Sequence, residues 1–189
     1  VDLISARSES YKHPAALPSV KPGTLRDDLR RRDFTINTLA LRLDNDHFGE
    51  LVDEVGGAKD LKAGLVRVLH PASFEDDPTR MFRAVRHEQR YGFKIDPATL
   101  GLIPGACLQV RRLSAQRIRH ELELILEEEN SVPMLKRLAD LGILLAVHPD
   151  LDFNKSAQLR FKRALANAGS IKDLPSRLTL CWSLWLMDV

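Results

Sequence analysis

Two adjacent residues, Arg32 and Asp33, join a run of arginines to an apolar segment in the stretch RRRDFTINTLAL, residues 30–41. A guanidinium can donate paired hydrogen bonds to phosphate oxygens, and a carboxylate accepts hydrogen bonds from hydroxyl groups such as those of ribose. Together the two side chains fit a nucleotide. The alternative is that Arg32 forms a surface ion pair with Asp27 or Asp28 one turn earlier, which would stabilise the chain little.

Asp77 and Arg80 stand three positions apart in the stretch EDDPTRMFRAVR, residues 75–86, for which we predict a helix. Residues at this spacing are neighbours on a helix, so the carboxylate and the guanidinium can lie side by side and point the same way. Such a pair matches the amine and ring nitrogen that cytosine and adenine present, and it opposes the reversed order in uracil and guanine. The alternative is an ordinary ion pair on a solvated helix face.

More basic residues follow on the same side of this predicted helix. Drawn at about 100° per residue, Arg83 and His87 share a face with Arg80, and Arg86 lies beside them. A local carboxylate does not balance so much positive charge. We therefore expect this row to contact the phosphates of a triphosphate or a polynucleotide.

The composition limits where such a site can be. The chain has 189 residues, 44% of them apolar, which suffices for one medium or two small domains with a packed core. The formal net charge is only +2, so a site for a polyanion must be local. Cys107 and Cys181 fit neither a CxxC motif nor a zinc pattern, which indicates a reducing compartment. No stretch is apolar enough to span a bilayer and no secretory signal is recognisable, so we predict a cytoplasmic protein.

Short strands and helices are predicted to position these charges within the first 70 residues. The expected elements are a strand over 1–6, a loop over 8–24, a helix over 24–32, a hairpin with strands at 39–43 and 49–53, a helix over 56–64 and a strand over 65–70. Thr24 and Asp27 form a capping box at the start of the first helix.

From Ala72 onward the pattern is helical, and we expect no further strand. The expected helices include one through 75–86, one capped by Ser114, one from Ser131 to Gly142, and two more over 156–168 and 175–189. The last helix is apolar on nearly every side and must be covered. We expect further chain to supply that cover, with a dimer interface as the alternative.

Four strings together carry a resemblance to a known family. They are RRDFTIN at 31–37, VDEVGGAKDLKAGLVRV at 52–68, FEDDPTRMFRAVR at 74–86 and LSAQRIRHELELIL at 113–126. In order and spacing they resemble the class II tRNA nucleotidyltransferases and bacterial poly(A) polymerases. The resemblance implies an α+β fold: the C-terminal part of a nucleotidyltransferase head over 1–70, a base-selecting helical neck over 71–149 and the start of a helical body over 150–189.

The resemblance also implies roles for individual residues. Arg32 and Asp33 match the motif that binds the nucleoside triphosphate and its ribose, and Asn37 belongs to the same string with a structural role. Asp77 and Arg80 match the template that pairs with CTP or ATP. The residues that would extend this surface towards nucleotide and phosphate are Arg83 and Arg86.

Metal binding is implied as well. The family transfers nucleotides with two Mg²⁺ ions held by carboxylates, and Asp2 matches the third acidic position of the head, both catalytic and metal-binding. The Asp-x-Asp pair of the family is missing from the sequence and would lie upstream of Val1. We therefore expect an internal fragment that binds nucleotide weakly and is inactive by itself.

The expected parent reaction transfers AMP or CMP from ATP or CTP to a tRNA 3′ end and releases pyrophosphate. These motifs do not separate CCA, A and CC addition from poly(A) synthesis, although we favour CCA or A addition. A non-catalytic RNA-binding module and a purely structural helical domain are the alternatives from other classes. The oligomeric state is left open, and no membrane partner is expected.

Overall fold

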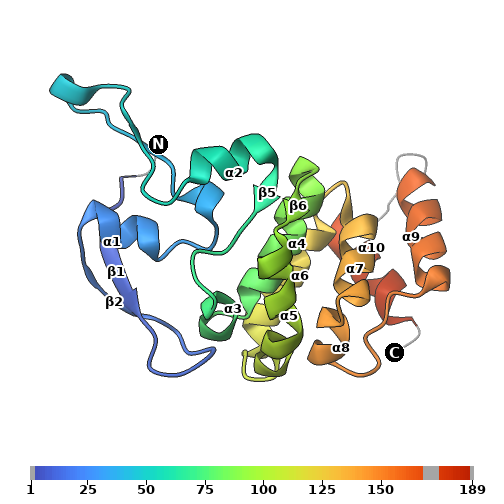
Figure 1. Ribbon diagram of the computed structural model, residues 1–189. Helices are drawn as coiled ribbons and strands as arrows, with labels where there is room; N and C mark the ends of the chain where they lie inside the picture. The colour runs from blue at the N-terminus through green and yellow to red at the C-terminus, as the bar shows by residue number, and fades with distance from the viewer. Residues whose placement is uncertain (1–2, 168–174, 188–189) are drawn as a thin grey trace.

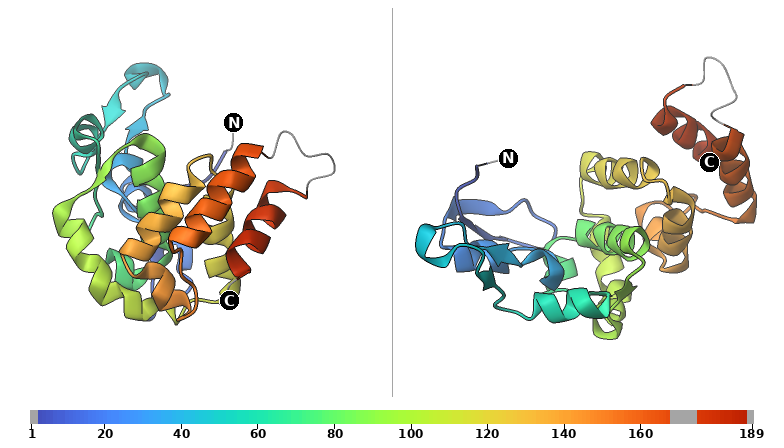
Figure 2. Two further views of the ribbon diagram at one scale, coloured as in Figure 1. Left: turned by 90° about the vertical axis from the view of Figure 1, so that its right-hand side faces the viewer. Right: turned by 90° about the horizontal axis from the view of Figure 1, so that it is seen from above.

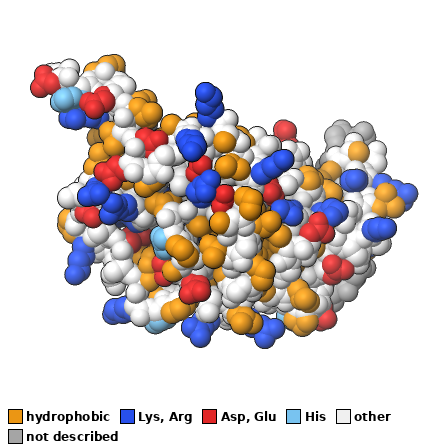
Figure 3. Space-filling model, in the orientation of Figure 1, with side chains coloured by type: hydrophobic (Ala, Val, Ile, Leu, Met, Phe, Trp, Pro, Cys, Tyr) orange, Lys and Arg blue, Asp and Glu red, His pale blue; other side chains and the backbone are white. Residues whose placement is uncertain are grey.

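The computed structural model describes residues 3–167 and 175–187. Short strands and helices of the N-terminal part lie at one end, and helices from α3 onward make up the rest of the molecule (Figure 1). Seen from above, the last two helices lie farthest from the N-terminal strands (Figure 2, right). Basic and acidic side chains are interspersed over the face drawn in Figure 3, in line with the small net charge.

The segment predicted as a loop over 8–24 contains an antiparallel hairpin. Strand β1 (Arg7–Ser10) pairs with β2 (Ser19–Pro22), with Arg7 opposite Pro22. The prolines that suggested a loop lie in the connection or at the end of β2, where a missing N–H is tolerated. The strand predicted over 1–6 is wrong for residues 3–6, which have no regular structure, and its first two residues lie outside the described part.

The capping box and the second hairpin are confirmed. Helix α1 (Leu25–Arg30) begins with reciprocal hydrogen bonds between Thr24 and Asp27. A short 3₁₀ turn, η1 (Thr35–Asn37), leads into β3 (Ala40–Leu41), which pairs antiparallel with β4 (Leu51–Val52). The connection carries a second 3₁₀ turn, η2 (Asn45–His47), and projects from the molecule at the upper left of Figure 1.

Helix α2 (Gly57–Ala63) starts where the sequence predicts it and is fastened to η1. A Cβ at Gly57 would clash with the carbonyl oxygen of Thr35, so only glycine permits this approach. The Asp53 carboxylate accepts hydrogen bonds from the N–H groups of Gly56 (2.9 Å), Gly57 (2.8 Å) and Ala58 (3.0 Å). These three donors would otherwise be unpaired at the helix start.

Asp53→Ala is expected to lower the free energy of unfolding by about 1 kcal/mol at pH 7, because the start of α2 loses its cap. Hydrogen bonds from Ala58, Gly57 and Gly56 lower the pKa of Asp53 below its ordinary value. A lowered pKa in the folded state means that the stabilisation is present above the unfolded pKa, about 3.9, and is lost as the pH falls through the folded pKa. Urea unfolding of both proteins should show the difference shrinking below about pH 4. A difference independent of pH would contradict this role, and Asp46→Ala in the exposed η2 turn is the control.

A parallel strand pair joins the N-terminal part to the helices. β5 (Leu65–Val66) pairs with β6 (Lys94–Ile95), so the expectation of no strand after residue 72 is wrong. The strand predicted over 65–70 is also shorter than expected. A two-residue strand is too short to show the alternation of apolar and polar residues that is typical of strands, and its pairing depends on a partner far along the chain.

The helix predicted through 75–86 is interrupted. It consists of α3 (Ser73–Asp76) and α4 (Thr79–Tyr91), and Asp77 between them is extended with φ −139° and ψ 95°. Pro78 follows, and a residue before proline is disfavoured in the helical conformation. The expectation that Asp77 and Arg80 lie side by side on one continuous helix is therefore wrong.

The remaining helices pack around a continuous apolar core. They are α5 (Pro97–Val110), α6 (Ala115–Leu126), α7 (Ser131–Asp140), α8 (Ile143–Val147), α9 (Lys155–Asn167) and α10 (Arg177–Leu186). Ser114 caps α6 and Gly142 follows α7 with φ +72°, as predicted, whereas α5 and α8 were not individually predicted. The core extends from Phe34 to Trp185. No helix in the described ranges is long and apolar enough to cross a membrane.

The last helix, α10, is covered on one side. Cys181 and Trp185 are buried, and the Trp185 indole donates to the carbonyl of Asp152 (2.9 Å). On the other side Trp182 and Leu186 line an open apolar groove with residues of α6. The expectation of additional cover therefore concerns this groove, and it stays a prediction.

Candidate functional site

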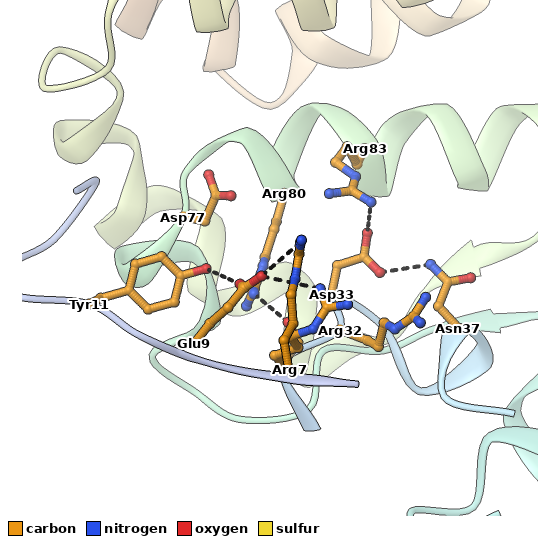
Figure 4. Close-up of a pocket in the computed structure, with 10 residues that line it drawn as sticks. Arg7, Glu9, Tyr11, Arg32, Asp33, Asn37, Asp77, Arg80 and Arg83 are labelled. Carbon is orange, nitrogen blue, oxygen red and sulfur yellow. Dashed lines mark hydrogen bonds and ion pairs between the residues drawn. The ribbon is translucent and has the colours of Figure 1, made fainter. Parts of the chain in front are cut away.

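A polar cavity of about 330 Å³ lies between β1, the segment after α1 and the start of α4 (Figure 4). Its lining residues are Arg7, Glu9, Tyr11, Arg31, Arg32, Asp33, Asn37, Asp77, Arg80 and Arg83. These include five arginines and three carboxylates, so the lining carries a formal charge of +2. An excess of guanidinium groups favours an anionic ligand.

Asp33 is held in place from three directions. Arg83 forms an ion pair with its Oδ2 at 2.6 Å, and the Asn37 amide (2.7 Å) and the Phe34 N–H (3.0 Å) donate to its Oδ1. Figure 4 shows Arg83 approaching one oxygen of this carboxylate from above and Asn37 approaching the other from the right. Asn37 lies within η1, so this short turn orients Asp33, in line with the structural role expected for Asn37.

Arg32 forms the ion pair considered as its alternative role, and it also lines the cavity, so its nucleotide-binding role stays a prediction. It pairs with Asp28 at 2.8 Å, the surface contact considered as the alternative, and it also lines the cavity with 42% of its side chain exposed. Arg31 pairs with the same carboxylate at 2.7 Å. Burial of Asp28 opposes its ionisation, but the hydrogen bonds from Arg32 and Arg31 outweigh this and lower its pKa. Asp28 thereby holds two arginines at the cavity edge.

Besides Arg31, three residues of the cavity were missed in the sequence: Arg7, Glu9 and Tyr11. Alternate residues of a strand face the same side, and all three point from β1 and its extension towards the cavity (Figure 4). Glu9 forms an ion pair with Arg7 (3.1 Å) and accepts hydrogen bonds from Arg31 (3.2 Å) and the Tyr11 hydroxyl (3.4 Å). The alternation RSESY would have indicated them, had the segment been predicted as a strand.

Asp77 and Arg80 line the same cavity through different supports. Asp77 Oδ1 accepts from the Thr79 N–H (3.0 Å), the Thr79 hydroxyl (2.6 Å) and Arg117 Nη2 (2.7 Å). Arg80 is 4% exposed and donates to the Ser73 hydroxyl (2.7 Å) and the Arg31 carbonyl (3.0 Å). Both side chains are thus fixed by the protein at the rim that they share.

Acidic groups from other elements partly offset the positive charge of the basic residues along α4. Arg83 pairs with Asp33, and Arg86 is not among the lining residues of the cavity. Burial lowers the pKa of His87, which donates to the Arg83 carbonyl, despite the opposing effect of Asp33. Burial also raises the pKa of Glu121 on α6, against the opposing effects of Arg83 and Arg86.

The predicted metal ligand, Asp2, lies outside the described residues. Within residues 3–167 and 175–187 no three His, Cys, Asp or Glu side chains are grouped so that they could hold a metal ion. The described carboxylates at the cavity are each paired with arginines, which is a poor donor set for a cation.

Two family models match the chain. Residues 1–67 match the poly(A) polymerase head domain, and residues 92–154 match a probable RNA- and SrmB-binding site of polymerase A. The two matches lie on either side of α3 and α4, the segment that contributes Asp77, Arg80 and Arg83.

Individual proteins show the same likeness. The A-adding tRNA nucleotidyltransferase of Geobacter sulfurreducens is 48% identical over 153 residues, which are 80% of this chain and 17% of that protein. A CCA-adding enzyme in an apo form gives a TM-score of 0.90 at 35% identity, covering 98% of this chain and 45% of that one. The Thermotoga maritima CCA-adding enzyme complexed with tRNA gives 0.77 at 37% identity, covering 86% and 41%.

Other similar solved structures are CCA-adding enzymes in complexes with CTP and with ATP. The chain spans less than half the length of the relatives compared above. Its small paired strands and predominant helices agree with the α+β fold of these enzymes. The chain therefore belongs to the family of tRNA nucleotidyltransferases and bacterial poly(A) polymerases.

Proposed function

We propose that the cavity binds the nucleoside triphosphate of a tRNA 3′-end nucleotidyltransferase, which transfers AMP or CMP from ATP or CTP to the RNA 3′ hydroxyl and releases pyrophosphate. The observation that carries the proposal is the meeting of Arg32, Asp33, Asp77 and Arg80 at one net-positive cavity. These residues come from two separate sequence motifs. A nucleoside triphosphate needs contacts to its phosphates, its ribose and its base at the same time, and the cavity offers groups suited to each.

Asp33 would accept a ribose hydroxyl. Its Oδ1 accepts from Asn37 and Phe34, whereas its buried Oδ2 pairs with the Arg83 guanidinium at 2.6 Å but accepts no hydrogen bond from the described residues. An acceptor that is buried without a donor is costly, and a ribose hydroxyl donating to Oδ2 would satisfy it. Arg32, which is partly exposed at the cavity edge, would donate to the phosphates, and Arg83 and Arg86 would extend this positive surface.

Asp77 and Arg80 would select the base. The protein contacts of Asp77 use Oδ1, which directs Oδ2 to a base amine. Arg80 has five N–H donors, of which Ser73 and Arg31 take two, so donors remain for a ring nitrogen. Adenine and cytosine present an amine beside a ring acceptor, whereas guanine and uracil present the reverse.

We extend the proposal to the organisation of the chain. Residues 1–70 would form part of the head, 71–149 the base-selecting neck and 150–189 the start of the body that contacts tRNA. The core and the β5–β6 pair both cross residue 70, so the first two units would move as one. The two Mg²⁺ ions and the role of Asp2 stay predictions from the family, as does a cytoplasmic location.

A or CCA addition is favoured over poly(A) synthesis because similar proteins carry the name A-adding tRNA nucleotidyltransferase or are CCA-adding enzymes. CC addition is also represented among the relatives. The cavity selects amine-bearing bases in each of these reactions. What differs between them is the RNA end and the order of addition.

Asp77→Ala should lower the preference of the protein for ATP over GTP by roughly tenfold, because a charged hydrogen bond to the base amine is lost. Isothermal titration calorimetry of both nucleotides measures the ratio directly and needs no turnover. Asp76→Ala is the matched control, since Asp76 is adjacent but does not line the cavity.

Three outcomes separate the function classes. A lower ATP preference in Asp77→Ala alone supports the proposal. Nucleotide binding with the same preference in wild type and Asp77→Ala would favour the RNA-binding module, in which the arginines contact only phosphates. A melting temperature that no nucleotide shifts would favour a structural helical domain.

A further inference from the structure

Ser73, the first residue of α3, contacts both residues proposed to read the base. Its hydroxyl accepts a hydrogen bond from Arg80 Nη1 (2.7 Å), and its carbonyl accepts one from the Asp77 N–H (3.2 Å). Ser73 is 0% exposed, and its neighbour Phe74 lies in the apolar core. The core therefore fixes α3, and α3 fixes the hydroxyl that meets Arg80.

Two supports define how the Arg80 guanidinium lies. Its Nη1 donates to the Ser73 hydroxyl, and its Nη2 donates to the Arg31 carbonyl (3.0 Å). Figure 4 shows the side chain running from α4 into the cavity. A guanidinium is planar, so anchoring two of its nitrogens sets the plane in which its remaining N–H groups point. With a single anchor the group can turn about that contact.

Both supports of Arg80 are uncharged groups, a hydroxyl and a carbonyl. Other arginines around the cavity are paired with carboxylates: Arg31 with Asp28, Arg83 with Asp33 and Arg117 with Asp77. Among the residues that the structure describes, no carboxylate forms an ion pair with Arg80, although this residue is only 4% exposed. A guanidinium that is buried without a counter-ion is costly, and its positive charge stays available to a ligand.

We infer that Ser73 is a positioning residue for base selection: its hydroxyl holds the Arg80 guanidinium in a fixed plane without neutralising its charge. This inference rests on the proposed function. A carboxylate at position 73 would pair with Arg80 and compete with the ligand, whereas an apolar side chain would leave Nη1 without this acceptor. Of the two supports, Ser73 provides the one that a substitution can remove, because the other is the backbone carbonyl of Arg31.

The test compares Ser73→Ala, Ser73→Thr and the matched control Ser131→Ala by isothermal titration calorimetry with ATP, GTP, CTP and UTP. Ser131 is also 0% exposed and its hydroxyl also accepts from an arginine, Arg177 Nη2 (3.2 Å), but it lies at the start of α7 and does not line the cavity. Ser73→Ala should lower the ATP-over-GTP and CTP-over-UTP binding ratios about tenfold, the effect of one lost hydrogen bond to a charged group. Ser73→Thr keeps the hydroxyl and should recover most of both ratios. Ser131→Ala should match wild type.

Two further variants test how the hydroxyl acts. Ser73→Asp should lower the affinity for ATP about tenfold, because the new carboxylate pairs with Arg80 and occupies the charge that the ligand would use. Adding Ser73→Ala to Arg80→Met should cause no further loss of discrimination, because Ser73 acts through that guanidinium. The Ser73 carbonyl that accepts from the Asp77 N–H is part of the backbone, so each of these variants changes only the contact to Arg80.

The outcomes distinguish this inference from the function on which it rests. If wild type itself binds all four nucleotides equally, the proposed function fails, and this inference fails with it. If wild type discriminates and Ser73→Ala keeps the same ratios, or Ser73→Asp binds ATP as tightly as wild type, only this inference is overturned. An equal loss for all four nucleotides in Ser73→Ala, or the same fall in the ratios in Ser131→Ala, would show a merely structural effect and would also overturn it.

Discussion

Replacing Arg80 with methionine is expected to weaken ATP binding by up to about a hundredfold, because the charged hydrogen bond to the ring nitrogen of the base is lost. The melting temperature should stay within about 4 °C of wild type, which corresponds to about 1 kcal/mol for a chain of this size. Isothermal titration calorimetry and thermal unfolding measured on the same samples provide the two numbers.

The small effect on stability follows from two opposing terms. Arg80 is 4% exposed, and taking a guanidinium out of water is costly. Its removal relieves that cost but leaves the Ser73 hydroxyl and the Arg31 carbonyl without this donor, at about 1–3 kcal/mol each. Methionine fills a similar volume with flexible apolar atoms. The relief of the desolvation cost and the loss of the two hydrogen bonds therefore nearly cancel in the free energy of unfolding, whereas the lost contact to the base still weakens binding.

Arg80→Lys is the conservative control. An ammonium keeps the charge but cannot serve Ser73, Arg31 and a base simultaneously in one plane, so we expect discrimination between ATP and GTP to fall with stability retained. If Arg80→Met binds ATP as tightly as wild type, the guanidinium serves only to fasten α4 to the segment after α1. The base-selecting role would then be excluded.

Asp33→Asn is expected to lower the preference for ATP over dATP by roughly tenfold, because an amide is a weaker acceptor for a ribose hydroxyl than a carboxylate. The variant keeps the shape of the side chain and an oxygen that can accept from Asn37 and Phe34. The measurement is the ratio of the two dissociation constants, which cancels any general loss of affinity.

The stability of Asp33→Asn should fall only modestly. The Arg83 side chain is 37% exposed, so solvent screens the charge that loses its partner, and we expect a cost of about 1 kcal/mol. Arg83→Gln is the matched control, since it breaks the same ion pair but leaves the Asp33 carboxylate. If the ATP-over-dATP ratio is unchanged in Asp33→Asn but changed in Arg83→Gln, the residue that contacts the ribose is Arg83 and not Asp33.

Local features of the sequence predicted the structure where one short segment contains all the interacting groups. The Thr24 and Asp27 capping box, the hairpin of β3 and β4 and the Ser114 cap of α6 each form within a few residues of the chain. The interruption between α3 and α4 is also a local feature of the sequence. Pro78 disfavours a helical conformation at Asp77, although a single continuous helix was predicted.

The sequence by itself determined the family and part of the cavity lining, because the strings around Arg32, Asp33, Asp77 and Arg80 are specific to that family. Only the tertiary structure decided that β1 contributes Arg7, Glu9 and Tyr11, and that Arg117 holds Asp77 from 40 residues away. Local propensity and periodicity act over one or two turns of chain, whereas these contacts arise when the core brings distant segments together. A side chain whose partner is distant in sequence therefore gives no local signal of its role.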